Sequence, residues 1–141
     1  MADIASDLLD RILTHAAATP GREVCGLLLG HGDHVEQVQP CANVAADPTR
    51  HFEIDPAALI AAHRAARAGG AAVIGHYHSH PSGSAVPSAR DAADAAPDGA
   101  LWLIVAAGAV QAWRAVDAGV VEGRFAAELL AILPGPASVK T

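Results

Sequence analysis

The feature that most constrains this chain is a series of short apolar runs separated by turn-forming residues. The run at 23–29 (EVCGLLL) ends at Gly30, and a short run bounded in this way is typical of a buried strand. The segment 30–33 predicts a hairpin turn into the next strand, where apolar and polar residues alternate. In chain order the predicted strands are 23–29, 35–39, 51–54, 72–78, 101–107 and 110–116, with the last two turned at Gly108.

Helix signals lie between these strands. Ser6 is the expected cap of a first helix that runs to about residue 18. Asp55 and Pro56 supply an N-cap and a first-turn proline for a second. The predicted helices cover 6–18, 55–69, a segment starting at Ser88, and the end of 123–133, which we expect to begin as a strand. Helices and strands alternate without a strict βαβ repeat, so we predict a mixed α/β fold in a single domain over 1–141, with a frayed tail from about 134.

Charge and hydropathy exclude several classes of partner. The formal net charge is −6, and the 9 Lys and Arg residues are scattered, whereas binding to nucleic acid needs clustered positive charge. The N-terminus carries acids where a signal peptide needs positive charge, and no apolar run reaches the roughly 18 residues of a membrane span. Cys25 and Cys41, on neighbouring predicted strands, are expected to be reduced core thiols. We therefore expect a cytoplasmic protein that binds neither nucleic acid nor membrane.

Three histidines alternate along the end of one predicted strand. Alternate residues of a strand face the same side, so His76, His78 and His80 project together while Tyr77 and Ser79 point away. A single histidine is usually only solvated or hydrogen-bonded. Three imidazoles on one face, beside a loop with a carboxylate, instead favour a metal site and suit zinc.

The carboxylate follows the loop after His80. Seven residues (PSGSAVP) separate His80 from Ser88, and Asp91 then lies on the first turn of the next helix. The spacing of Ser88 and Asp91 also matches a helix capping box. Ser88 could cap and still donate its proton elsewhere, but we expect Asp91 to serve either as a cap or as a ligand, because a metal-bound oxygen is poorly placed for capping.

Two histidines and one aspartate would leave a fourth zinc position for water, which is the arrangement of catalytic sites. Such a site needs a base for the water and a donor for the developing oxyanion, and Ser88 could be that donor. Glu23 is the best candidate for the base, because a charge at the mouth of a buried strand has little reason to be there unless it is used. A water-exposed acid at the strand edge is the alternative.

The whole pattern resembles the JAMM motif of MPN-domain zinc metallopeptidases. The matching residues are Glu23, then His78-Ser79-His80, seven residues, Ser88, two residues and Asp91. The strand 23–30, the segments 43–45 and 52–55, and the loop 80–83 are also similar to the family, and the resemblance runs from about residue 4 to 116.

This resemblance implies that His78, His80 and Asp91 bind one zinc ion, that Glu23 is the acid-base residue, and that Ser88 stabilises the oxyanion. His76 would then be a neighbour of the site. The implied fold is a curved mixed sheet flanked by helices, similar to cytidine deaminases. Short bacterial members of the family imply an isopeptidase acting after the C-terminal glycine of a ubiquitin-like or sulfur-carrier protein with a Gly-Gly end.

Other interpretations remain open at this point. A catalytically silent MPN scaffold usually lacks a ligand, and none is missing here. A cupin-like metal-binding protein would need a glutamate soon after the second histidine, and 81–87 contains none. Thiol catalysis by Cys25 lacks an activating cation in the sequence. The alanine-rich helix 55–69 could pack against a second copy, giving a homodimer, or could cover the sheet.

Overall fold

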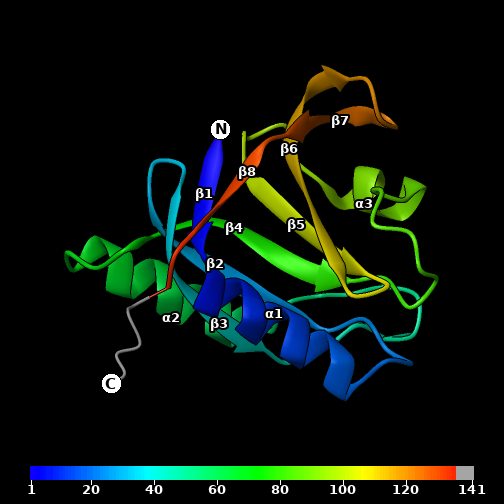
Figure 1. Ribbon diagram of the computed structural model, residues 1–141, viewed down its shortest axis with the longest axis horizontal. Coiled ribbons are helices and arrows are strands. Elements are labelled where there is room, and N and C mark those ends of the chain that lie inside the picture. Colours follow the sequence, from blue (N-terminus) through cyan, green and yellow to red (C-terminus); the bar gives the residue numbers. More distant parts are fainter. Residues whose placement is uncertain (136–141) are drawn as a thin grey trace.

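The computed structural model describes residues 1–135 and has one eight-stranded mixed sheet with three helices (Figure 1). The elements are β1 (Ala2–Ala5), α1 (Ser6–Ala18), β2 (Cys25–His31), β3 (His34–Cys41), α2 (Pro56–Arg67), β4 (Ala72–Ser79), α3 (Ala89–Asp94), β5 (Leu101–Ala106), β6 (Ala109–Gly119), β7 (Gly123–Glu128) and β8 (Leu130–Leu133). Their order across the sheet is β7-β6-β5-β4-β2-β3-β1-β8. Most neighbours are antiparallel, but β1 is parallel to β3 and β8, and β4 is parallel to β5. The predicted mixed sheet flanked by helices is confirmed, while the likeness to cytidine deaminases stays a prediction.

The two longer helices pack on opposite faces of the sheet. Leu8 and Ile12 of α1 are buried in the cluster that contains Leu28 of β2 and Tyr77 of β4. Ala62 of α2 packs in a separate cluster with Leu27 and Leu29. Side chains alternate along β2, so Leu28 faces the side covered by α1, whereas Leu27 and Leu29 face the side covered by α2. Helix α2 therefore covers the sheet, and a homodimer through it stays a prediction.

The N-terminus differs from the prediction. Residues 2–5 form β1, which pairs with β3 and β8, and Ala5 rather than Ser6 occupies the N-cap position of α1 with no side-chain cap. The Ser6 hydroxyl instead accepts a hydrogen bond from the Gly135 N–H at 3.0 Å. The strand leads directly into the helix, so the predicted cap is wrong by one position.

The C-terminal segment also differs. The helix predicted at the end of 123–133 is wrong: the chain forms β7 and then β8, which pairs in parallel with β1 along its whole length. The strand predicted at 51–54 is reduced to a single bridge between Ile54 and Asn43. The predicted frayed tail lies outside the described residues from 136 onward.

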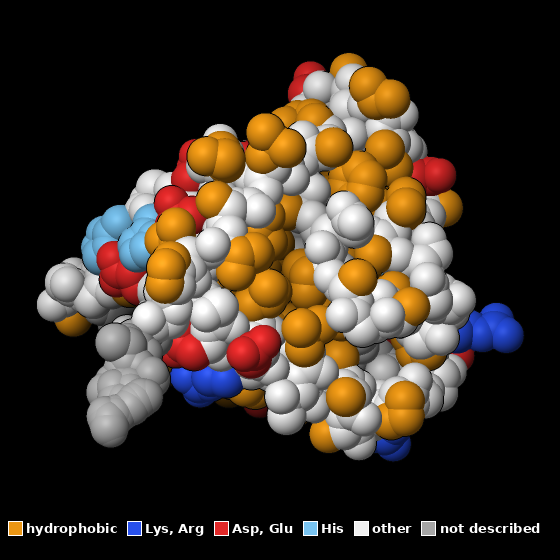
Figure 2. Space-filling model, in the orientation of Figure 1, with side chains coloured by type: hydrophobic (Ala, Val, Ile, Leu, Met, Phe, Trp, Pro, Cys, Tyr) orange, Lys and Arg blue, Asp and Glu red, His pale blue; other side chains and the backbone are white. Residues whose placement is uncertain are grey.

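Hydrophobic side chains gather along the middle of the face that α1 and β8 cross, and Lys and Arg lie at its margins (Figure 2). Leu129, just before β8, and Ile132, within β8, are among the exposed large hydrophobic residues. Within residues 1–135, no helix is long and apolar enough to cross a membrane.

A close approach of two backbones positions the histidine strand. Gly75 of β4 pairs with Leu101 of β5, and a Cβ atom at residue 75 would lie 1.9 Å from the Leu101 carbonyl oxygen. Only glycine allows the two strands to meet at this distance.

Gly75→Ala is therefore expected to destabilise the protein by about 1–3 kcal/mol, the usual cost of overpacking. Denaturant unfolding measures this change. Gly21→Ala is the matched control, because a Cβ atom there would meet nothing within 4 Å. Equal stability of the two variants would contradict the close approach.

Candidate active site

Two imidazoles and one carboxylate converge where β4 ends. His78 Nε2 lies 3.1 Å from His80 Nε2 and 3.3 Å from Asp91 Oδ1, and His80 Nε2 lies 3.1 Å from Asp91 Oδ2. All three side chains are buried. The structure thus brings together all three predicted ligands.

Backbone hydrogen bonds and contacts of the histidine rings hold the end of β4 in place. The His80 N–H donates to the Val105 carbonyl, and the Ser79 N–H donates to the Val24 carbonyl. His80 Nδ1 donates to the Ser84 carbonyl oxygen at 2.7 Å, which fixes the orientation of the ring with Nε2 facing Asp91. The His78 ring stacks on Phe52, with centroids 4.2 Å apart. Burial lowers the pKa of His78, which favours the neutral imidazole that a metal ligand needs.

Asp91 both caps a helix and faces the histidines. Its Oδ2 accepts a hydrogen bond from the Ser88 N–H at 2.9 Å, while its N–H donates to the Ser88 hydroxyl oxygen at 3.0 Å. The capping role is confirmed for Oδ2, while Oδ1 remains directed at His78; that Asp91 also binds a metal stays a prediction. Burial alone would raise the pKa of Asp91, but the hydrogen bonds with His78 and His80 hold it far below its ordinary value.

Glu23 lies in the short segment before β2, which begins at Cys25 rather than at residue 23 as predicted. Its side chain is only 7% exposed. One carboxylate oxygen and one nitrogen each of His78 and His80 lie within 4.8 Å of one another. Burial raises the pKa of Glu23 to about 7, with opposing effects from His80 and Asp91. A carboxyl group of this kind can both take and give a proton near neutral pH.

Two residues that the sequence reasoning did not single out hold the Glu23 segment. Asn43 donates from Nδ2 to the Glu23 carbonyl at 2.8 Å and to the His51 carbonyl at 2.9 Å. The Ser79 hydroxyl accepts from the Val24 N–H at 2.9 Å, so the histidine strand itself fixes the residue after Glu23. No local pattern marked Asn43, because its partners are set only by the fold.

His76 lies on the same face of β4, as the alternation predicts, but it is not one of the converging residues. Its ring centroid is 5.6 Å from that of His78 and 4.2 Å from that of Trp102. Its Nε2 is buried and has no hydrogen-bond partner among the described residues.

Cys25 is not a nucleophile in this structure. Burial raises the pKa of the Cys25 thiol to about 12, which keeps it protonated. Cys25 and Cys41 are cross-strand partners and both are free thiols, as predicted.

The cluster fits a tetrahedral metal ion. Two ligand atoms that are each about 2.0–2.1 Å from a tetrahedral ion lie about 3.3 Å apart. His78 Nε2 and His80 Nε2 are 3.1 Å apart, and each faces a different oxygen of Asp91, Oδ1 at 3.3 Å for His78 and Oδ2 at 3.1 Å for His80. The donors are thus two nitrogens and a carboxylate at about the spacing that such an ion requires. Glu23 also has a carboxylate oxygen within 4.8 Å of a nitrogen of His78 and a nitrogen of His80, so it lies close to the same position.

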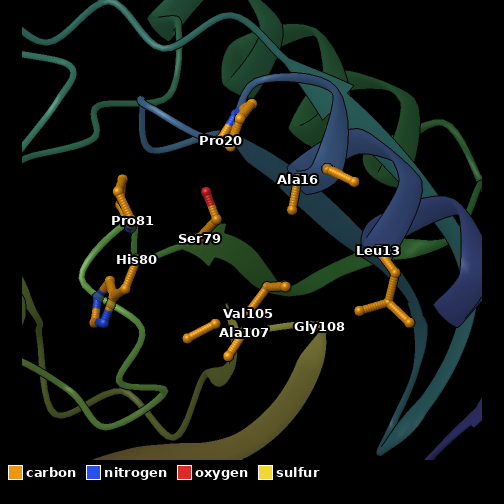
Figure 3. A pocket seen from close by; sticks show the side chains of 11 residues that line it. Leu13, Ala16, Pro20, Ser79, His80, Pro81, Val105, Ala107 and Gly108 are labelled. Atoms are coloured by element: carbon orange, nitrogen blue, oxygen red, sulfur yellow. The ribbon is translucent and has the colours of Figure 1, made fainter.

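Glu23 and Ser88 line one open cleft of about 230 Å³, together with His80. A second cavity of about 240 Å³ lies on the other side of His80, between α1 and the turn from β5 to β6 (Figure 3). Its lining is mainly apolar and includes Leu13, Ala16 and Val105. The polar groups suited to catalysis are therefore gathered in the first cleft.

The family model for prokaryotic homologues of the JAB domain matches residues 5–117 of this chain. The chain belongs to this family. The JAB chain is 40% identical over 107 residues to a desampylase of Haloferax volcanii, covering 72% of the chain and 77% of the relative. It is 38% identical over 88 residues to a probable TtuB-protein conjugate cleaving protease of Thermus thermophilus, covering 62% of the chain and 59% of that protein.

A JAB1/MPN domain protein from Archaeoglobus fulgidus has the same fold, with a TM-score of 0.59 and 21% identity. The alignment covers 93% of the JAB chain and 99% of that protein. The resemblance to the JAMM/MPN family is confirmed, and the chain is a hydrolase of this family. This result excludes the cupin interpretation.

Proposed function

We propose that this JAB protein is a zinc-dependent isopeptidase. It would hydrolyse the amide bond after the C-terminal glycine of a ubiquitin-like or sulfur-carrier protein with a Gly-Gly end. The observation that carries the proposal is the placement of the Glu23 carboxyl group within 4.8 Å of the His78 and His80 nitrogens, in a cleft that Ser88 also lines. The names of the two relatives, a desampylase and a conjugate-cleaving protease, support this substrate class.

His78, His80 and Asp91 would hold the zinc ion, because their donor atoms are those that catalytic zinc sites use. Bound zinc would supply Lewis-acid chemistry, polarising the scissile carbonyl and lowering the pKa of water from about 15.7 to about 7.

Glu23 would move the proton. Its carboxylate would accept a proton from the attacking water, and the resulting carboxylic acid would pass that proton to the leaving amine. The raised pKa of Glu23 suits both steps, because a group that ionises near neutral pH exchanges protons readily in either direction. The hydrogen bond from Asn43 and the Ser79–Val24 pairing would keep the carboxyl group at this distance from the histidines.

Ser88 would donate to the developing oxyanion. Its hydroxyl oxygen accepts the Asp91 N–H, which leaves the hydroxyl proton free to point into the cleft. Loss of one such donor commonly lowers kcat by about 10²–10³-fold.

Ser88→Ala is expected to lower kcat to that extent and to keep zinc bound. Ser88→Thr is the matched control, since threonine retains both the cap and the donor and should restore most of the rate. Steady-state kinetics and zinc analysis of the purified variants provide the test. A change in KM alone, with kcat unaltered, would assign Ser88 to capping only.

The proposed function itself is tested with the zinc-loaded protein and carrier proteins from the same source, conjugated through their terminal glycine to lysine. Mass spectrometry is expected to find the free carrier with an intact C-terminal glycine carboxylate. A full zinc complement without cleavage of any such conjugate would instead favour the catalytically silent scaffold.

We also propose that the protein acts in the cytoplasm. Cys25 and Cys41 lie opposite each other on β2 and β3 and remain thiols, as is typical of a reducing compartment.

A further inference from the structure

A cavity of about 830 Å³ lies beside the candidate active site and is not used by the proposed mechanism. It is bounded by the loop 45–53, by His76 of β4 and Trp102 of β5, and by the exposed side of α3. Phe52 forms the partition: its ring lines the cavity and also stacks on the predicted ligand His78 at 4.2 Å. A side chain bound in this cavity would therefore lie one ring away from the reacting centre.

The rim of the cavity carries an excess of negative charge. Three carboxylates line it, from Asp47, Glu53 and Asp94, against one cation, Arg90. The Arg90 Nε donates to the Asp94 carboxylate at 2.8 Å, so this cation is already paired. Asp47 accepts hydrogen bonds from Thr49 rather than from a cation, so its charge and that of Glu53 can attract a positively charged group.

The inner wall presents histidine and aromatic rings. His76 and His51 line the cavity, and His76 Nε2 and His51 Nδ1 lie beneath its surface with no hydrogen-bond partner among residues 1–135. Phe52 and Trp102 add aromatic surface, which attracts cations. Ammonium and guanidinium groups carry positive charge, so they match both the carboxylates of the rim and the aromatic rings of the wall.

We propose that this cavity binds a lysine or arginine side chain of the protein substrate, on the amine side of the bond that is cleaved. The proposal rests on the proposed function, because glycine at the carrier end has no side chain to enter the cavity. We assign the side chain to the acceptor protein, next to the conjugated lysine. The protein would prefer conjugates on basic segments.

Binding can be measured without any hydrolysis. The zinc-loaded protein is titrated with three unconjugated acceptor peptides that carry a central lysine flanked by arginine, alanine or glutamate. We expect the Trp102 indole N–H resonance to move saturably with the arginine peptide and much less with the other two. The Trp113 indole, which donates to the Ala85 carbonyl outside the cavity, is the internal reference.

Salt and charge variants test the cause of binding. Raising the salt concentration from about 0.1 M to about 1 M shortens the Debye length from about 10 Å to about 3 Å, so binding should weaken. The double variant Asp47→Asn and Glu53→Gln is expected to weaken binding of the arginine peptide at least about threefold. Asp117→Asn, an exposed acid on β6 outside the cavity, is the matched control and should bind as the wild type does.

No shift of Trp102, an equal shift with the glutamate peptide, or unchanged binding by the double variant would overturn the proposal. The outcome is separate from that of the proposed function, because peptide binding needs no turnover. Binding without cleavage of any conjugate would refute the isopeptidase and leave the basic-side-chain site standing. If conjugates are cleaved equally well with and without basic flanking residues and no peptide binds, the basic-side-chain site is refuted and the isopeptidase stands.

Discussion

Glu23→Gln is expected to lower the rate of conjugate hydrolysis by at least about 10²–10⁴-fold, the usual contribution of a general acid-base group. The physical reason is that glutamine has nearly the same shape but can neither take a proton from water nor return it to the leaving amine. The zinc content should be unchanged, because the predicted ligands His78, His80 and Asp91 remain. Single-turnover kinetics on a glycine-linked conjugate and zinc analysis of the same sample are the measurements.

The variant should also fold normally. A carboxyl group whose pKa is raised in the folded state stabilises the protein below its unfolded-state pKa, and this contribution is lost as the pH rises through the folded-state value of about 7. In the metal-free protein above pH 7, Glu23→Gln should therefore be at least as stable as the wild type. Glu36→Gln, which changes an exposed acid on β3, is the control for the general effect of removing a carboxylate. Near-normal turnover by Glu23→Gln would remove Glu23 from the mechanism.

His78→Ala and Asp91→Asn are expected to abolish stoichiometric zinc binding. Loss of a partner outside the ligand set commonly costs about 10–100-fold in metal affinity, so loss of a ligand itself should exceed that range. Asp91→Asn preserves the size of the side chain and separates metal loss from the cavity that His78→Ala would leave next to Phe52. Metal analysis after dialysis, followed by competition with a chelator, measures the affinity.

The matched control for this prediction is His76→Ala. His76 lies on the same face of β4 and is also buried at its Nε2, yet it is outside the cluster of converging donors. It should retain one zinc ion per chain. Zinc loss in His76→Ala, or an unchanged zinc content in His78→Ala, would refute the proposed ligand set.

Local signals predicted several elements well. Asp55 accepts a hydrogen bond from the Ala57 N–H as the N-cap of α2, and Pro56 occupies its first turn. Ser88 is the N-cap of α3, again as predicted. Each of these features depends on residues within one or two turns of the chain, so pattern and capping chemistry are enough to find them.

The prediction failed where pairing is non-local. The segment 123–133 contains alanine, leucine and glutamate, which favour helix, yet it forms β7 and β8. Strand β8 exists because β1 offers an unpaired edge at the other end of the chain, and strand pairing overrides local preference. The failure at Ser6 has the same origin, since β1 lies immediately before α1 and was not predicted.

The sequence by itself determined which side chains could act as ligands and that His76 and His78 share one face of a strand, because alternation is a property of the extended backbone. Only the tertiary structure decided which groups meet. The pairing of β2 with β4 brings Glu23 to the histidines, and the capping box of α3 turns one oxygen of Asp91 toward His80 while leaving the other for His78. These distances depend on how separate elements pack, and no local pattern in the chain contains that information.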